Sequence, residues 1–325
     1  MNLRVPRRLV VLLASVALLA SACSSGEATS GDGVSSPEPA APTELAVAVA
    51  SYDLAVGDYQ RFIAGVLTPE RGLIGFGEVD LQFARLGEDG DADPIPGPET
   101  VGRWLPVPGI APTGDTGQPT LIDQPGAAGV YQTWVDFDQP GFWTVEVTAQ
   151  VDGQQLTGSG TFRVGTENEV PALGEMAPAS DSLTVDSPGP AGGIDSRAGG
   201  DVEIPDPVLH ATSIADAIAA GRPAVVVFST PVYCVSRFCG PITDTVEELA
   251  STHGDRAEFI HVEVWKDFEE AELNDAAADW IQTEAGGNEP WVFLIGADGR
   301  VAARWDNVLD LDELVELLDA LPTTE

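Results

Sequence analysis

The chain has 325 residues with 52 acidic and 15 basic side chains, so its formal net charge is −37. A protein this acidic repels phosphate backbones, which excludes nucleic acid as a partner. The length exceeds what one ordinary domain needs, and 43% of the residues are hydrophobic, so we expect two packed domains. The 35 glycines and 25 prolines indicate turns and linkers around them.

The first 23 residues have the pattern of an export signal. Arg4, Arg7 and Arg8 precede the apolar run LVVLLASVALLA, which is too short to remain as a membrane span. Cys23 then follows small residues in LASAC, which resembles the lipobox of bacterial lipoproteins. This resemblance implies that 1–23 is a lipoprotein signal peptide and lipobox. It also implies that a lipid on Cys23 anchors the mature chain to the cell membrane, on its extracytoplasmic face. The alternative is an ordinary secretory signal with a chance cysteine.

Composition divides the remaining chain into two folded segments and two connecting ones. Residues 24–43 are rich in Ser, Gly, Pro and Glu, which is typical of a disordered tether. Residues 165–204 have a similar Pro- and Gly-rich composition and are predicted to be a linker. The folded segments are therefore 44–164 and 205–322.

The first folded segment has the pattern of an all-β domain. Over 129–164, short runs of alternating apolar and polar residues are broken by the turn sequences DQPG and VDGQQ. Short strands with regular turns predict a β-sandwich, and this stretch resembles the later strands of bacterial immunoglobulin-like domains. The segment has no cysteine, so no disulfide joins its sheets. We expect the domain to present the chain or bind a partner.

A run of aspartates in the first segment resembles the start of a calcium loop. Asp89, Asp91 and Asp93 stand at alternate positions in EDGDADP. However, Pro94 stands where an EF-hand loop requires glycine, and no glutamate follows at the twelfth position. We therefore interpret the run as a solvated hairpin tip and predict no metal site and no cofactor for the chain.

The second folded segment alternates helical and strand patterns. PAVVVFST reads as a strand buried on both faces, and the stretch with Cys234 and Cys239 follows it directly. Pro290 precedes a second apolar strand, WVFLI, and an Asp-Gly turn and an amphipathic helix close the segment. This order resembles the thioredoxin fold through nearly all of 205–322. The expected fold class is thus an all-β immunoglobulin-like sandwich followed by an α/β thioredoxin-like domain.

The place of the two cysteines favours redox chemistry. A strand that delivers the chain to a helix N-terminus puts a thiolate beside unpaired N–H groups, which lowers the pKa of the thiol. A second thiol can then resolve a mixed disulfide. In thioredoxin-like proteins a cis-proline faces the sulfurs and shapes the substrate groove. Pro290 matches that residue, and Tyr233 and Glu289 would lie beside it.

The motif departs from the family in two ways. Four residues separate Cys234 from Cys239 where two are usual, and five helical steps turn through about 500°, so both sulfurs cannot bond on one regular helix. Either cysteine can be aligned with the attacking position. Val227 lies near the position of the family's buried aspartate, so protons would move through Glu289 or solvent. Arg237 is a candidate thiolate stabiliser, or simply a solvent-facing side chain.

Three functions remain open from the sequence. The first is a membrane-anchored extracytoplasmic thiol–disulfide oxidoreductase, which acts through Cys234 and Cys239 on the thiols or disulfides of exported proteins, with an unidentified redox partner. The second is a non-catalytic binding lipoprotein in which the pair is a structural disulfide, although so short a loop gains little stability from it. The third is a thioredoxin-like Cu(I) chaperone. His210, His253 and His261 are the available histidines, and none lies in the segment that supplies the ligand in such chaperones.

Overall fold

The computed structural model describes residues 44–70, 72–114, 116–199, 202–283 and 286–322. The predicted signal peptide, the lipidation residue Cys23 and the predicted tether lie outside the described residues. Within the described part of the chain, no helix is both long and apolar enough to cross a membrane.

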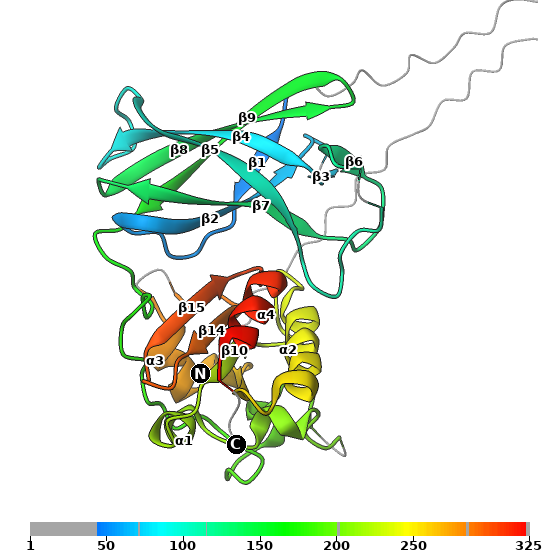
Figure 1. Cartoon of the computed structure of the whole chain (residues 1–325), viewed down its shortest axis with the longest axis vertical. Helices are drawn as coiled ribbons and strands as arrows, with labels where there is room; N and C mark the ends of the chain where they lie inside the picture. The colour runs from blue at the N-terminus through cyan, green and yellow to red at the C-terminus, as the bar shows by residue number, and fades with distance from the viewer. Residues whose placement is uncertain (1–43, 71, 115, 200–201, 284–285, 323–325) are drawn as a thin grey trace, which may run out of the picture. The chain divides into compact units, whose positions relative to one another are not determined.

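The first folded part is an all-β sandwich of antiparallel strands (Figure 1). The strands that the structure describes here are β1 (Ala46–Val49), β2 (Gly57–Leu67), β3 (Leu73–Gly75), β4 (Glu78–Gly87), β5 (Ile95–Pro106), β6 (Thr120–Ile122), β7 (Gly129–Phe137), β8 (Gly141–Val151) and β9 (Gln154–Val164). Their order is β6-β3-β2-β7-β5-β4-β8-β9, and β1 pairs with β2. The long strand β5 pairs with β4 along most of its length and with β7 at its end, so it joins the two layers.

Alternating side chains build the core of this sandwich. Along β8, every second residue is buried, as expected for a strand with one face in the core and one outside. Phe62 from β2 and Phe83 from β4 meet edge to face at 5.0 Å between ring centroids. Because these strands belong to different layers, the aromatic contact packs one layer against the other.

Within the segment predicted to be a linker, described residues between 165 and 199 pack against the second folded part. Val170 and Ala177 belong to a core cluster of that part, and Asp195 is completely buried. A short 3-10 helix, η1 (Ala191–Gly193), lies within the segment. A few apolar side chains can hold an irregular segment in place when they pack into a neighbouring core, and composition does not indicate such packing.

The second folded part is a mixed α/β structure. Its helices and strands are η2 (Pro207–His210), α1 (Ile214–Ala219), β10 (Ala224–Ser229), α2 (Cys239–His253), β11 (Glu258–Glu263), β12 (Trp265–Asp267), β13 (Glu272–Leu273), α3 (Asp275–Ile281), β14 (Trp291–Ile295), β15 (Val301–Asp306) and α4 (Leu311–Ala320). The main sheet has the order β11-β10-β14-β15. β10 runs parallel to β11 and antiparallel to β14, while β12 and β13 form a separate hairpin.

Helices cover both faces of this sheet (Figure 1). β10 is buried along its whole length, and its side chains alternate between two clusters. Val226 and Phe228 pack with α1 and α3, whereas Val225 and Val227 pack with α2 and α4. A fully apolar strand is therefore required, because neither face of it meets water.

The two folded parts lie in one compact unit and are joined by a buried ion pair. Arg61 of β2 contacts Asp306 of β15 at 2.8 Å, with 6% and 7% of the two side chains exposed. The same guanidinium donates to the backbone carbonyls of Asp306 and Val308. Tyr52 donates its hydroxyl to the carbonyl of Glu289 at 3.0 Å. The sandwich is thus attached beside the predicted cysteine site.

Candidate functional site

Cys234 and Cys239 form a disulfide that spans the loop between β10 and α2. Their Cα atoms are 6.1 Å apart. Cys239 is the first residue of α2, and Cys234 lies in the preceding loop, where its N–H donates to the carbonyl of Thr230. This placement explains the five-residue spacing, because the sulfurs meet across a turn and do not share a regular helix.

The two sulfurs have different surroundings. Cys239 is completely buried, whereas Cys234 is partly exposed. The hydroxyl of Ser236 lies 3.2 Å from the Cys234 sulfur and accepts a hydrogen bond from the N–H of Phe238. Cys239 stands where the N–H groups of the first helical turn have no partner within the helix, which favours a thiolate there once the disulfide opens.

A cis peptide bond joins Glu289 to Pro290, immediately before β14. Pro290 is buried and Glu289 is half-buried. A carboxylate oxygen of Glu289 and the two sulfurs of Cys234 and Cys239 lie within 4.8 Å of one another. The structure therefore brings together both cysteines and Glu289.

Glu289 has an altered affinity for protons. Burial raises the pKa of its carboxyl, and the negative charge of Glu263 raises it further. Glu263 ends β11, is itself buried, and accepts hydrogen bonds from the N–H groups of Ser196 and Trp265. A carboxyl with a raised pKa beside a disulfide can hold a proton and pass it to a departing thiolate.

Exposed apolar side chains border the partly exposed sulfur. Val232 and Val235 are 54% and 93% exposed. Tyr233, between them and next to Cys234, stacks in parallel on Phe268 with 4.0 Å between ring centroids. Solvent-exposed apolar residues gathered at one place are typical of a surface that binds a polypeptide.

Arg237 and Val227, two further positions considered from the sequence, lie in different surroundings. Arg237 is exposed and has a left-handed backbone conformation, with φ of 67°. Val227 lies inside the apolar cluster formed with α2 and α4, so no ionisable side chain occupies its position. Of the predicted groups, Glu289 is thus the carboxyl that the structure places beside the sulfurs.

The histidines lie apart from the cysteines. His210 and His261 meet each other and Asp195 in a separate buried group, while the sulfurs group with Glu289. His253 lies at the end of α2, where its ring contacts Thr252. Sequence reasoning missed Asp195 because it stands within the segment predicted to be a linker, and no short motif connects it to either histidine.

Comparisons with known proteins do not assign the chain to a family. No protein-family model matches the chain, and no curated protein matches it either. The solution structure of the PKD domain from human VPS10 domain-containing receptor SorCS2 aligns with 46% of this chain and 98% of its own, at 16% identity and a TM-score of 0.19. A TM-score this low carries no argument, so the immunoglobulin-like assignment stays a prediction.

Proposed function

We propose that this protein is a thiol–disulfide oxidoreductase that acts on exported proteins at the extracytoplasmic face of the membrane. The single observation that carries the proposal is the grouping of Cys234, Cys239 and Glu289 within 4.8 Å, beside the cis bond to Pro290. A purely structural disulfide needs no carboxyl beside it, and a carboxyl with a raised pKa is a feature of acid–base sites.

The proposal includes a thioredoxin-like topology for the α/β part. Its support is the strand order β11-β10-β14-β15, with one parallel and two antiparallel pairings. Further support comes from the cysteine loop that links the buried strand β10 to α2, and from the cis-proline that precedes β14. These features agree with the order of elements expected from the sequence.

In the proposed oxidising direction, a substrate thiolate attacks the partly exposed Cys234 sulfur. The Cys234–Cys239 bond breaks, a mixed disulfide forms, and Cys239 leaves as a thiolate at the N-terminus of α2. Glu289 supplies the proton that this thiolate takes up. A second substrate thiolate then attacks the substrate sulfur of the mixed disulfide, and Cys234 leaves as a thiolate that takes up a proton from solvent. The substrate becomes a disulfide, the protein becomes a dithiol, and two electrons have moved to the protein. When the same steps run in reverse, the protein dithiol reduces a substrate disulfide.

The test uses the full-length protein with Cys23→Ser, so that Cys234 and Cys239 are its only thiols. A fluorescent dithiol peptide and its disulfide form are the substrates, with glutathione buffers as the electron source or sink. We expect multiple turnovers in at least one direction, and loss of turnover in Cys234→Ser and in Cys239→Ser. No turnover in either direction by the folded protein would favour the structural disulfide and refute the proposal.

A further inference from the structure

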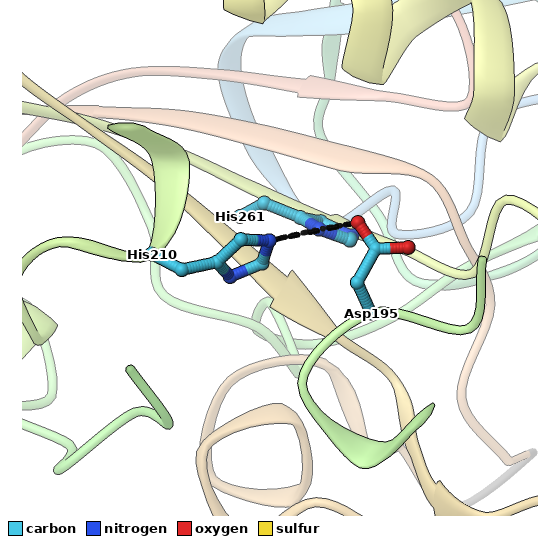
Figure 2. A group of neighbouring side chains, drawn as sticks. All are labelled: Asp195, His210 and His261. Carbon is cyan, nitrogen blue, oxygen red and sulfur yellow. Dashed lines mark hydrogen bonds and ion pairs between the residues drawn. The ribbon is translucent and has the colours of Figure 1, made fainter. Parts of the chain in front are cut away.

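Three fully buried side chains from separate segments converge in the α/β part (Figure 2). Asp195 follows η1, His210 ends η2, and His261 lies in the middle of β11. Both imidazole rings are turned toward the carboxylate, and none of the three side chains has exposed area. This cluster takes no part in the proposed thiol chemistry.

The three facing atoms form a nearly equilateral triangle. Oδ2 of Asp195 lies 3.5 Å from Nε2 of His210 and 3.4 Å from Nδ1 of His261. The two nitrogens are 3.4 Å apart. These separations are longer than the 2.7–2.9 Å typical of hydrogen bonds between charged groups. Arg197 contacts the same carboxylate at 2.7 and 3.0 Å, so the carboxylate can form ordinary hydrogen bonds.

The size of the triangle matches the coordination shell of a metal ion. Ligand atoms about 2.0–2.1 Å from a tetrahedral Zn²⁺ are about 3.3–3.4 Å from one another. Imidazole nitrogens with one carboxylate oxygen are donors that suit Zn²⁺, whereas Cu(I) prefers thiolates and thioethers. The spacing and the donor set therefore agree on the same class of ion.

Neighbouring groups orient two of the three donors, His261 and Asp195, as metal ligands are usually oriented, whereas Nδ1 of His210 is buried without a hydrogen-bond partner among the described residues. Nε2 of His261 lies 3.2 Å from the carbonyl oxygen of Ser229. Since a carbonyl can only accept, the ring hydrogen is on Nε2 and the lone pair of Nδ1 faces the centre of the triangle. Arg197 holds Asp195 through its guanidinium and its backbone N–H.

We propose that Asp195, His210 and His261 form a binding site for one divalent transition-metal ion, with Zn²⁺ as the best fit. A cavity of about 130 Å³ lies next to the cluster and is lined in part by His261 and Gly193. Because the three ligands have no exposed area, the role assigned to the ion is structural. It fastens the coil that carries Asp195 to β11, an edge strand of the sheet.

The surroundings of the cluster reach both ends of the cysteine loop. The hydroxyl of Ser229 bonds that of Thr243 at 2.7 Å, and Thr243 donates to the carbonyl of Cys239. Next to Asp195, the hydroxyl of Ser196 accepts from the N–H of Val232 at 3.2 Å. Loss of the ion is therefore expected to loosen the cysteine loop as well as the coil.

The test uses the full-length protein carrying Cys23→Ser, without a histidine tag and with Cys234–Cys239 oxidised so that no thiol can bind metal. After treatment with EDTA, the protein is titrated with Zn²⁺ or Co²⁺ alone. We expect one ion per chain by elemental analysis, visible absorption of tetrahedral Co²⁺, and a rise in Tm of about 5 °C or more at saturating Zn²⁺.

Variants separate this site from adventitious binding. His210→Asn and Asp195→Asn should lose the Co²⁺ spectrum and the metal-dependent rise in Tm. His253→Gln, which changes the histidine outside the cluster, should keep both. The proposal is overturned if the unsubstituted protein binds no metal and its Tm does not respond to Zn²⁺. That measurement is independent of whether any variant folds. Equal loss of metal in His253→Gln would also overturn it.

Discussion

Cys234 is partly exposed, whereas its disulfide partner Cys239 is completely buried as the first residue of α2. In the proposed exchange, an incoming substrate can therefore reach only the Cys234 sulfur without movement of α2. The asymmetry assigns different roles to two chemically identical side chains, and the sequence alone left either role open to either cysteine.

The first prediction concerns trapping of the mixed disulfide. In the Cys239→Ser variant, with Cys23→Ser as background, a disulfide-containing peptide should form a stable adduct with Cys234, because no second thiol can resolve it. The Cys234→Ser variant should form the adduct at least about 10-fold more slowly, because its remaining thiol, that of Cys239, is buried. Mass spectrometry of quenched samples measures both rates. Equal rates, or faster trapping in Cys234→Ser, would contradict the assigned roles.

The second prediction concerns Glu289 and pH. A carboxyl whose pKa is raised in the folded protein stabilises the fold below its unfolded pKa, and that contribution is lost as the pH rises through the folded pKa. Because the Gln side chain does not ionise, the Glu289→Gln variant does not lose this stability as the pH rises. The Tm of the variant relative to the unsubstituted protein should therefore increase from about pH 4 to about pH 8, as measured by calorimetry.

A control for this experiment is Glu270→Gln, which changes an exposed glutamate of the same part of the protein. Its relative Tm should stay nearly constant over the same range. If the proton held by Glu289 is also used in catalysis, Glu289→Gln should slow exchange while leaving the binding of peptide unchanged. A pH-independent difference in Tm for Glu289→Gln would argue against a raised pKa.

The third prediction concerns the exposed apolar residues beside Cys234. Phe268 is 44% exposed, so an apolar peptide can pack on its ring, and an aromatic contact of this kind contributes about 0.5–1.5 kcal/mol, which corresponds to about a two- to tenfold change in binding. Phe268→Ala should therefore raise KM for an apolar peptide substrate by about that factor. Exchange with glutathione, which is too small to span these residues, should be unaffected. A parallel fall in both reactions would instead indicate a disturbed cysteine loop.

The fourth prediction concerns the attachment of the sandwich to the α/β part. Arg61→Met leaves the buried carboxylate of Asp306 without its partner, and such a change costs about 3–5 kcal/mol of stability. Denaturant unfolding should show this loss. Arg103→Met is the matched control, because Arg103 pairs with Glu78 where the two side chains are 83% and 59% exposed. The control should cost about 1 kcal/mol or less.

Much of the fold follows from local pattern. The alternating runs over 129–164 are the strands β7, β8 and β9, and the expected turns separate them. PAVVVFST predicted a strand buried on both faces, and β10 is buried throughout. Each of these elements carries its own periodicity, because its side chains face either a core or water in regular alternation.

The remaining features depend on contacts between segments that are distant in sequence. The segment 165–199 has the composition of a linker, and its packing depends on apolar contacts such as those of Val170 and Ala177 with the core of the α/β part. Asp195, His210 and His261 come together across 66 positions of chain, with no spacing that resembles a known ligand motif. Likewise, the unequal exposure of Cys234 and Cys239 depends on where α2 begins, which the sequence did not locate to one residue.

The reduction potential of the Cys234–Cys239 pair tests the central claim most directly. Full-length protein with Cys23→Ser is equilibrated in glutathione buffers of known ratio, and the reduced fraction is measured by thiol alkylation. An exchange site predicts a potential between about −270 and −120 mV, the range of known oxidoreductases. A potential below about −300 mV is typical of structural disulfides and would contradict the account.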